Sequence, residues 1–262
     1  MTSKKNAILL RNIKRTSHSF LLGGGVIVIL LVLWEILSIS GLVDPTFSSS
    51  PSRVIKAGAI LIQDGSLLKN IIASGKTFIL GVILAIVVGI PIGVTVGWFK
   101  TANKAFGPLI AAFNTTPRIA LMPLFIIWFG LGLGSKLALV FLSSVFPLIL
   151  NMQASMNNLD NELITVAKAY GANNKKIFTT IALPMSVPFL ITGLRLSIRG
   201  ALMGVVASEV FGGSEGIGYL IQYAGATFQT DKVFVCVFII ATFGIIIDRT
   251  LLSINRRFDI WR

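Results

Sequence analysis

Residues 165–184 read TVAKAYGANNKKIFTTIALP and form the most strongly patterned polar stretch of the chain. In this stretch and just before it, apolar residues recur at the spacing of one helix face: Leu163, Val166, Ala167 and Tyr170. Gly171 is expected to end this helix, because glycine adopts a left-handed conformation at little cost. Asn173 or Asn174 would cap a second short helix, which ends at Leu183-Pro184. Its apolar face would comprise Ile177, Phe178, Ile181 and Ala182. The stretch therefore predicts two small helices joined at a glycine, lying against a membrane as a rigid surface for another protein.

The composition predicts an integral membrane protein. The chain has 262 residues, of which 54% are hydrophobic and 13% charged, whereas soluble domains contain about 25% charged residues. The formal net charge of +13 would indicate nucleic acid in a soluble protein. In a membrane protein it indicates cytoplasmic anchoring and anionic lipid, so no nucleic acid partner is expected.

The chain offers little material for catalysis or metal binding. Cys236 and His18 are the single residues of their types. A disulfide within the chain, a histidine-cluster metal site and a Ser-His-Asp triad are therefore all hard to build. We expect no metal site, and no enzymatic activity from this chain.

Six apolar stretches are long enough to cross a membrane as helices, which predicts an all-α fold. They cover about residues 20–40, 77–98, 105–129, 137–156, 185–210 and 233–252. A basic tail, 1–18, precedes them, and no small-residue cleavage site follows the first stretch, so it is expected to remain as a span. Residues 19–262 would then form a single transmembrane domain, with 157–184 as a loop between the fourth and fifth spans.

The basic residues predict the orientation. Most Lys and Arg residues outside the spans fall on the side of both termini, including Lys4, Lys14, Lys100, Lys168, Lys175 and Arg257. By the positive-inside rule, this side is cytoplasmic. The sequence therefore predicts a multi-pass protein of the bacterial inner membrane, with both termini and the 157–184 loop in the cytoplasm.

Small residues recur every fourth position in the second span, at Gly81, Ala85, Gly89, Gly93 and Gly97. Such a stripe lets another helix approach closely. We predict that the stripe packs against a neighbouring helix; a substrate groove is the alternative.

Three arginines fall inside predicted spans: Arg118, Arg195 and Arg199. A mid-membrane arginine costs about 2.5–3.5 kcal/mol on insertion scales, so each should face a partner or a wet cavity. Glu209 is a candidate counter-charge. One hypothesis is that Arg118, with Pro117, lines a path for an anion; the other is a structural ion pair or a hydrogen bond to backbone freed by Pro117. Arg195 and Arg199 are assigned a structural role or, alternatively, a gating role.

The 165–184 stretch resembles a signature of the permease subunits of binding-protein-dependent ABC importers. That signature is Glu-Ala-Ala, three residues, Gly, nine residues, then Ile-x-Leu-Pro, in a cytoplasmic loop. Gly171, Ile181, Leu183 and Pro184 match at full spacing, and Ala167 matches the second alanine. Thr165 and Val166 stand at the glutamate and first-alanine positions. The plain alternative is an ordinary amphipathic surface loop.

Two further stretches resemble the nitrate, sulfonate and taurine group of these importers: 117–132, and 208–219 with its Ser208-Glu209-Val210-Phe211-Gly212-Gly213 run. The resemblance implies the type I importer permease fold, with a cytoplasmic coupling helix. It implies a second copy of the chain, two ATPase subunits and an extracytoplasmic solute-binding protein. ATP and Mg²⁺ would be bound by the ATPase, since Gly75-Lys76-Thr77 lacks the first glycine of a P-loop.

The expected cargo is a small anion such as an alkanesulfonate, taurine or nitrate. Two other classes of protein compete with this prediction. An ATP-independent secondary transporter or channel would have no reason to carry the patterned loop. A non-transporting membrane scaffold would not need arginines inside its spans.

Overall fold

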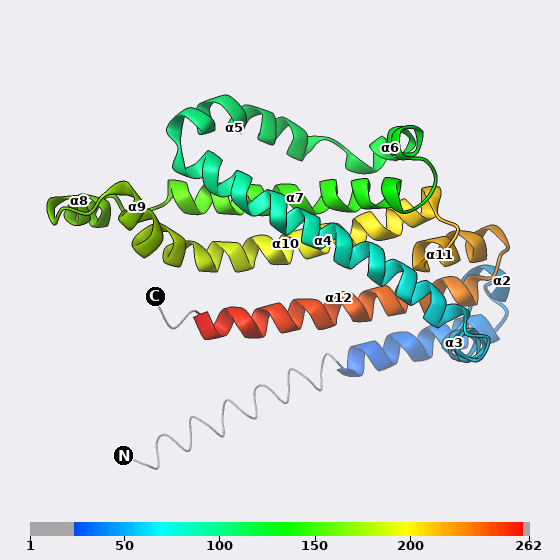
Figure 1. Cartoon of the computed structure of the whole chain (residues 1–262). Helices are drawn as coiled ribbons and strands as arrows, with labels where there is room; N and C mark the ends of the chain where they lie inside the picture. The colour runs from blue at the N-terminus through cyan, green and yellow to red at the C-terminus, as the bar shows by residue number, and fades with distance from the viewer. Residues whose placement is uncertain (1–23, 259–262) are drawn as a thin grey trace, which may run out of the picture.

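The computed structural model describes residues 24–258, which form an elongated bundle of helices (Figure 1). Four helices are long and apolar enough to cross a membrane, and a bent pair makes a fifth candidate. The shorter apolar helix Gly24–Ile39 corresponds to the described part of the first predicted span, 20–40. The all-α membrane fold is therefore confirmed. The basic tail, 1–18, and residues 20–23 lie outside the described part.

Helix α7 (Leu133–Asn157) lies at the centre of the bundle, between α4 (Ser66–Trp98) and α10 (Leu183–Gly212). Its apolar side chains are buried on both faces; Leu139, Val140 and Leu148 have no exposed surface. A membrane helix that is buried all round must pack against neighbours rather than lipid, which makes α7 the core of the fold.

The small residues of α4 pack against α7, as predicted. A Cβ atom added at Gly93 would lie 2.6 Å from the carbonyl oxygen of Ile149, and one at Gly97 would lie 2.7 Å from the Cβ of Met156. Ala85 of the same stripe is fully buried. The stripe lets two helix backbones approach until only hydrogen atoms fit between them, so it serves packing rather than a solute groove.

Helix α10 carries a second set of small residues that was not predicted. A Cβ atom at Gly193 would lie 3.0 Å from the Cβ of Asn151, and one at Gly204 would lie 3.1 Å from the Cα of Val140. Ala201 and Ser197, on the same side, are fully buried. Close approach to α7 therefore occurs from both sides.

The stretch 105–129 is not one straight helix but two, α5 (Lys100–Thr115) and the pair η1 (Arg118–Leu121) and α6 (Met122–Phe129), bent by 88°. Thr116 and Pro117 between them are extended, with ψ angles of 133° and 94°. The bend has a local cause: the ring of Pro117 excludes helical geometry at Thr116 and provides no N–H group.

One end of the bundle is closed by a collar, which we define as α2 (Pro45–Ser48), α3 (Pro51–Gln63) and the start of α12 (Thr230–Phe258). Ser49 Oγ donates to Asp231 Oδ1 at 2.7 Å, and Thr230 Oγ1 donates to the carbonyl of Thr46. Glu35 of the first helix accepts from the backbone N–H of Ser52 at 3.0 Å and from its hydroxyl at 2.7 Å. These bonds tie three distant segments together.

The two ends of the bundle differ. The short helix α8 (Asn161–Ala169) projects from one end, beside the carboxyl ends of α4 and α7 (Figure 1). Helix α11 (Ile217–Ala226) and the collar lie at the other. We call these the α8 end and the α11 end.

Candidate functional site

The α8 end contains the stretch that the sequence singles out. Asp160 caps α8, since its carboxylate accepts from the N–H of Glu162 at 2.8 Å. The helix ends as predicted at Gly171, which has a φ of +79°. Ala172 N–H donates to the carbonyl of Ala167, and Gly171 N–H donates to that of Lys168. This is the Schellman arrangement, in which a left-handed residue satisfies the last carbonyls of a helix.

The apolar face of α8 is left open. Leu163 is 47% exposed, Val166 54% and Tyr170 89%. Ile164 instead packs against the cluster around Met152, Met156 and Ala182. Ala167 is half-buried, and the hydroxyl of Thr165 donates to the carbonyl of Asn161 within its own helix. Thr165 therefore presents no charged group to the surroundings. Three exposed apolar side chains on a projecting helix are typical of a surface for another protein.

The second predicted helix begins as expected but does not end as expected. Asn173 caps α9 (Asn174–Ile177) by accepting from the N–H of Lys176 at 2.8 Å. Of its predicted apolar face, Ile177 and Ala182 are buried and Phe178 packs edge-on against Trp98.

The chain then continues through the π-helical turn η2 (Phe178–Ala182) into α10, so that Asn174–Gly212 is one helix. Leu183-Pro184 does not interrupt it. The N–H of Leu183 bonds the carbonyl of Phe178, five residues back. The wider turn admits Pro184, which has no N–H to give to an ordinary helical bond. Ile181 is half-buried beside this turn.

Arg118 lies at the bend between α5 and α6, in the first residue of η1. Its Nη2 donates to the carbonyl and to the side-chain oxygen of Asn114, each at 2.8 Å. The guanidinium lies over the ring of Phe146, 5.6 Å from its centroid. Within residues 24–258, its buried Nε has no hydrogen-bond partner. Arg118 thus bonds a carbonyl that the end of α5 leaves free, and it retains one unused donor.

Arg195 and Arg199 of α10 share a partner that lies far from them in the sequence. Asp248 of α12 accepts from Arg195 Nη2 at 3.1 Å and from Arg199 Nη2 at 2.8 Å. The prediction that Glu209 serves as counter-charge for these arginines is therefore wrong. Asp248 lies in the sixth span, more than 45 residues later in sequence. Only the packing of α12 on α10 brings it to them.

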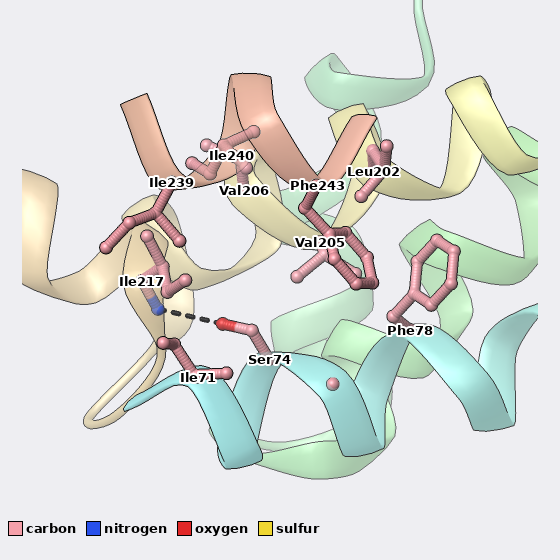
Figure 2. A pocket seen from close by; sticks show the side chains of 11 residues that line it. Ile71, Ser74, Phe78, Leu202, Val205, Val206, Ile217, Ile239, Ile240 and Phe243 are labelled. Carbon is pink, nitrogen blue, oxygen red and sulfur yellow. Dashed lines mark hydrogen bonds between the residues drawn. The ribbon is translucent and has the colours of Figure 1, made fainter. Parts of the chain in front are cut away.

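Glu209 instead holds the α11 end together. It is fully buried, and its carboxylate accepts from Ser74 Oγ of α4 and from the N–H of Gly218, each at 2.8 Å. Ser74 Oγ in turn accepts the N–H of Ile217 at 2.8 Å (Figure 2). A Cβ atom at Gly216 would overlap this carboxylate, which explains the glycine there.

Two further hydrogen bonds beside Glu209 hold the loop that precedes α11. Asn70 Oδ1 accepts the N–H of Gly216 at 2.7 Å, and Lys136 Nζ donates to the carbonyl of Glu215 at 3.0 Å. A small apolar cavity of about 110 Å³ adjoins Ser74 between α4, α10 and α12, with Phe78, Leu202 and Phe243 in its wall (Figure 2). These bonds position α11 against α4 and α10.

The predicted site residues therefore fall into separate groups. Thr165, Val166, Ala167, Gly171 and Ile181, with Leu183 and Pro184, gather at the α8 end. Arg195 and Arg199 meet Asp248, whereas Arg118 contacts Asn114 and Phe146. No hydrogen bond or ion pair in the described range joins Arg118 to either of these arginines or to Glu209.

Comparison with known proteins gives consistent matches. Residues 85–260 match the family model described as binding-protein-dependent transport system inner membrane component. A putative ABC transporter permease protein of Methanocaldococcus jannaschii is 34% identical over 88% of this chain and 88% of its own length. The taurine transport system permease protein of Escherichia coli is 28% identical over 94% of this chain and 91% of its own.

A solved structure matches the fold. A chain of the MetNI methionine ABC transporter in an inward-facing conformation superposes with a TM-score of 0.65 and 15% identity. The match covers 75% of this chain and 97% of that one.

Proposed function

The chain belongs to the family of binding-protein-dependent transport system inner membrane components, and we propose that it forms the path for a small organic or inorganic anion of the alkanesulfonate, taurine or nitrate type. As a permease subunit of an ABC importer, it is a non-catalytic transport component, and a separate subunit binds ATP. The family implies an ATPase and a binding protein as partners. The taurine permease among its relatives supports the choice of cargo.

The assembly that we propose contains two copies of this chain, two ATPase subunits and one extracytoplasmic binding protein. The α8 end faces the cytoplasm in this arrangement. The support is the distribution of basic residues along the sequence: with both tails included, the side that carries Lys100, Lys168 and Lys175 has 14 Lys and Arg residues and the other side has six, and cytoplasmic loops carry an excess of basic residues. Both termini then lie on the cytoplasmic side.

The ATPase binds, in this proposal, to the open face of α8. The observation that carries it is the exposure of Leu163, Val166 and Tyr170 on a helix that projects from the bundle. The Schellman turn at Gly171 fixes α8 relative to the helix Asn174–Gly212, which crosses the bundle without interruption. Movement of the ATPase would therefore be passed to the spanning helices. With Thr165 bonded to its own helix, the contact relies on apolar burial.

A binding experiment tests this docking surface. Tyr170→Ala removes an 89% exposed aromatic ring at the C-terminal end of α8, and loss of an interface aromatic typically costs about 2 kcal/mol. We expect affinity for the ATPase subunit to fall about thirtyfold, measured with the full-length chain in detergent. Tyr223→Ala is the matched control, because Tyr223 is half-exposed on α11. Unchanged affinity for the Tyr170 variant would refute the surface.

The cargo is tested separately, by ATP hydrolysis of the reconstituted complex with its binding protein and a panel of solutes. We expect stimulation by an alkanesulfonate, by nitrate or by taurine, a zwitterion that carries a sulfonate group, and by no solute that lacks an anionic group. Stimulation only by solutes without an anionic group would refute the proposed cargo while leaving the importer assembly intact. Solute uptake without ATP would indicate the secondary transporter instead.

Arg118, with Pro117 beside it, is our proposed anion contact in the path. The support is its position at the 88° bend between α5 and the pair η1 and α6, and its unused Nε donor. Arg118→Lys keeps the charge and Arg118→Gln removes it. If the arginine helps the anion to cross, Gln raises the solute concentration needed for half-maximal uptake and Lys raises it less. Uptake by both variants equal to that of the wild type, at normal protein level, would leave Arg118 with its structural bond to Asn114 alone.

A further inference from the structure

A groove of about 770 Å³ runs between α10 and α12, and its wall includes the Arg195–Arg199–Asp248 cluster described above. Apolar side chains form most of its wall: Leu202, Met203, Val206, Val237, Ile240 and Ile245. Charged residues gather at one end of it, namely Arg195, Arg199, Asp248 and Arg249. The groove is therefore amphipathic, with a long apolar part and one charged end.

The charged end has an excess of positive charge. Arg195 and Arg199 share the single carboxylate of Asp248, and Arg249 also lines the groove. One carboxylate offsets one guanidinium, so two positive charges remain. The side chain of Arg199 is 58% exposed despite its 2.8 Å bond to Asp248. It can donate further hydrogen bonds to an anion in the groove.

The charged end lies at the depth of lipid headgroups. Along α12, Asp248 is about 24 Å from Lys232 at 1.5 Å per residue, which approaches the hydrocarbon thickness of about 30 Å. The residues between them are uncharged. Lys232 belongs to the α11 end, so Asp248 and Arg249 mark the opposite border of the apolar layer. Helix α12 is the least buried of the long spans, as expected for a helix at the lipid boundary.

We propose that this groove binds an anionic phospholipid. Its phosphate contacts Arg199, Arg195 and Arg249, and one acyl chain lies along the apolar wall. Guanidinium groups match the geometry of phosphate oxygens, and basic pockets between membrane helices bind anionic headgroups. A soluble anion would use the arginines but leave the long apolar wall unoccupied. The inference rests on the membrane fold alone and does not depend on the cargo or on ATPase docking.

Native mass spectrometry of the full-length protein tests the site. Phosphatidylglycerol and phosphatidylcholine with the same acyl chains compete at equal concentration. We expect the wild type to prefer phosphatidylglycerol, and Arg199→Gln to lower that preference about fivefold, since each basic residue contributes about 1 kcal/mol. Lys69→Gln, an exposed basic residue at the α11 end, is the matched control and should change nothing.

A second variant tests the apolar part. Gly244 lines the groove, and a Cβ atom there would lie 3.7 Å from Leu202, so Gly244→Phe fills the space without a change in charge. We expect both lipids to be lost at an unchanged melting temperature. If Arg199→Gln folds poorly, Arg249→Gln replaces it, with the same expected loss of preference.

Three results would overturn the proposal. The preference for phosphatidylglycerol could survive in the arginine variants. Ethanesulfonate could protect Arg199 from chemical modification while phosphatidylglycerol does not, which would indicate a site for a soluble anion. Finally, the groove could bind no lipid because a second copy of the chain covers it. Crosslinking between two copies through Met203→Cys would detect this arrangement.

Discussion

At the scale of single residues, Gly171 and Glu209 show two different reasons for a residue to be required. Nothing lies within 4 Å of the Cβ position of Gly171, so space does not demand glycine there; its φ of +79° does. Glu209 is required by its partners, because Ser74 and Gly218 direct buried donors at its carboxylate. If the ATPase binds α8 as proposed, substitution of Gly171 should affect coupling, whereas substitution of Glu209 should affect stability.

Gly171→Ala should impair coupling with little effect on the membrane core. A left-handed conformation costs a residue with a Cβ atom about 1–2 kcal/mol, so the turn after α8 should loosen. We expect lower ATPase stimulation in the reconstituted complex, at a melting temperature close to that of the wild type. Gly225→Ala is the control, since Gly225 also has nothing within 4 Å but has no positive φ. Full stimulation by the Gly171 variant would contradict the role of the turn.

Glu209→Ala should lower stability. It leaves the hydroxyl of Ser74 and the N–H of Gly218 buried without an acceptor, and each unsatisfied group costs about 1–3 kcal/mol. Thermal unfolding in detergent measures the effect. Glu215→Ala serves as control, because the side chain of Glu215 is exposed and only its backbone carbonyl is bonded, to Lys136. Similar melting temperatures for the two variants would show that the buried carboxylate does not fasten the loop.

At the scale of helices, much of the fold follows from the sequence, because the apolar stretches and the glycine stripe are local patterns. The 88° bend was missed, although Pro117 is visible in the sequence. Proline inside a membrane helix is often tolerated, as at Pro91 in α4 and Pro147 in α7. The difference is that Thr116 becomes extended as well. Long-range partners such as Asp248 for Arg195 could not be predicted, because they depend on which helices become neighbours.

Gly93→Ala should disrupt the packing of α4 on α7. The added Cβ atom meets the backbone oxygen of Ile149 at 2.6 Å, and backbone cannot rotate away as a side chain can. Overpacking of this kind costs about 1–3 kcal/mol. We expect a lower melting temperature than for Gly75→Ala, which adds the same atom to the same helix where nothing lies within 4 Å. Equal melting temperatures would show that α4 and α7 accommodate the added Cβ atom without loss of stability.

At the scale of the whole molecule, the first helix is attached mainly through the collar. Residues 24–33 are exposed, whereas Trp34 bonds the carbonyl of Ser48 and Glu35 bonds Ser52. Glu35→Ala should therefore release the first turn of α3, at a cost of about 1 kcal/mol for a lost cap. Faster amide hydrogen exchange at residues 51–54 would confirm it. Asp64→Ala, which removes a local bond to Ser66, is the control and should leave that turn unchanged.

The uninterrupted helix Asn174–Gly212 also has a geometric consequence. Its 39 residues span about 58 Å at 1.5 Å per residue. If a helix of that length tilts as one unit by about 5° about one end, its other end moves by about 5 Å, roughly the length of one helical turn. Small angular changes at the α8 end would thus become displacements large enough to change which side chains are in contact at the α11 end. Glu209 lies near the end of the helix that would undergo this displacement.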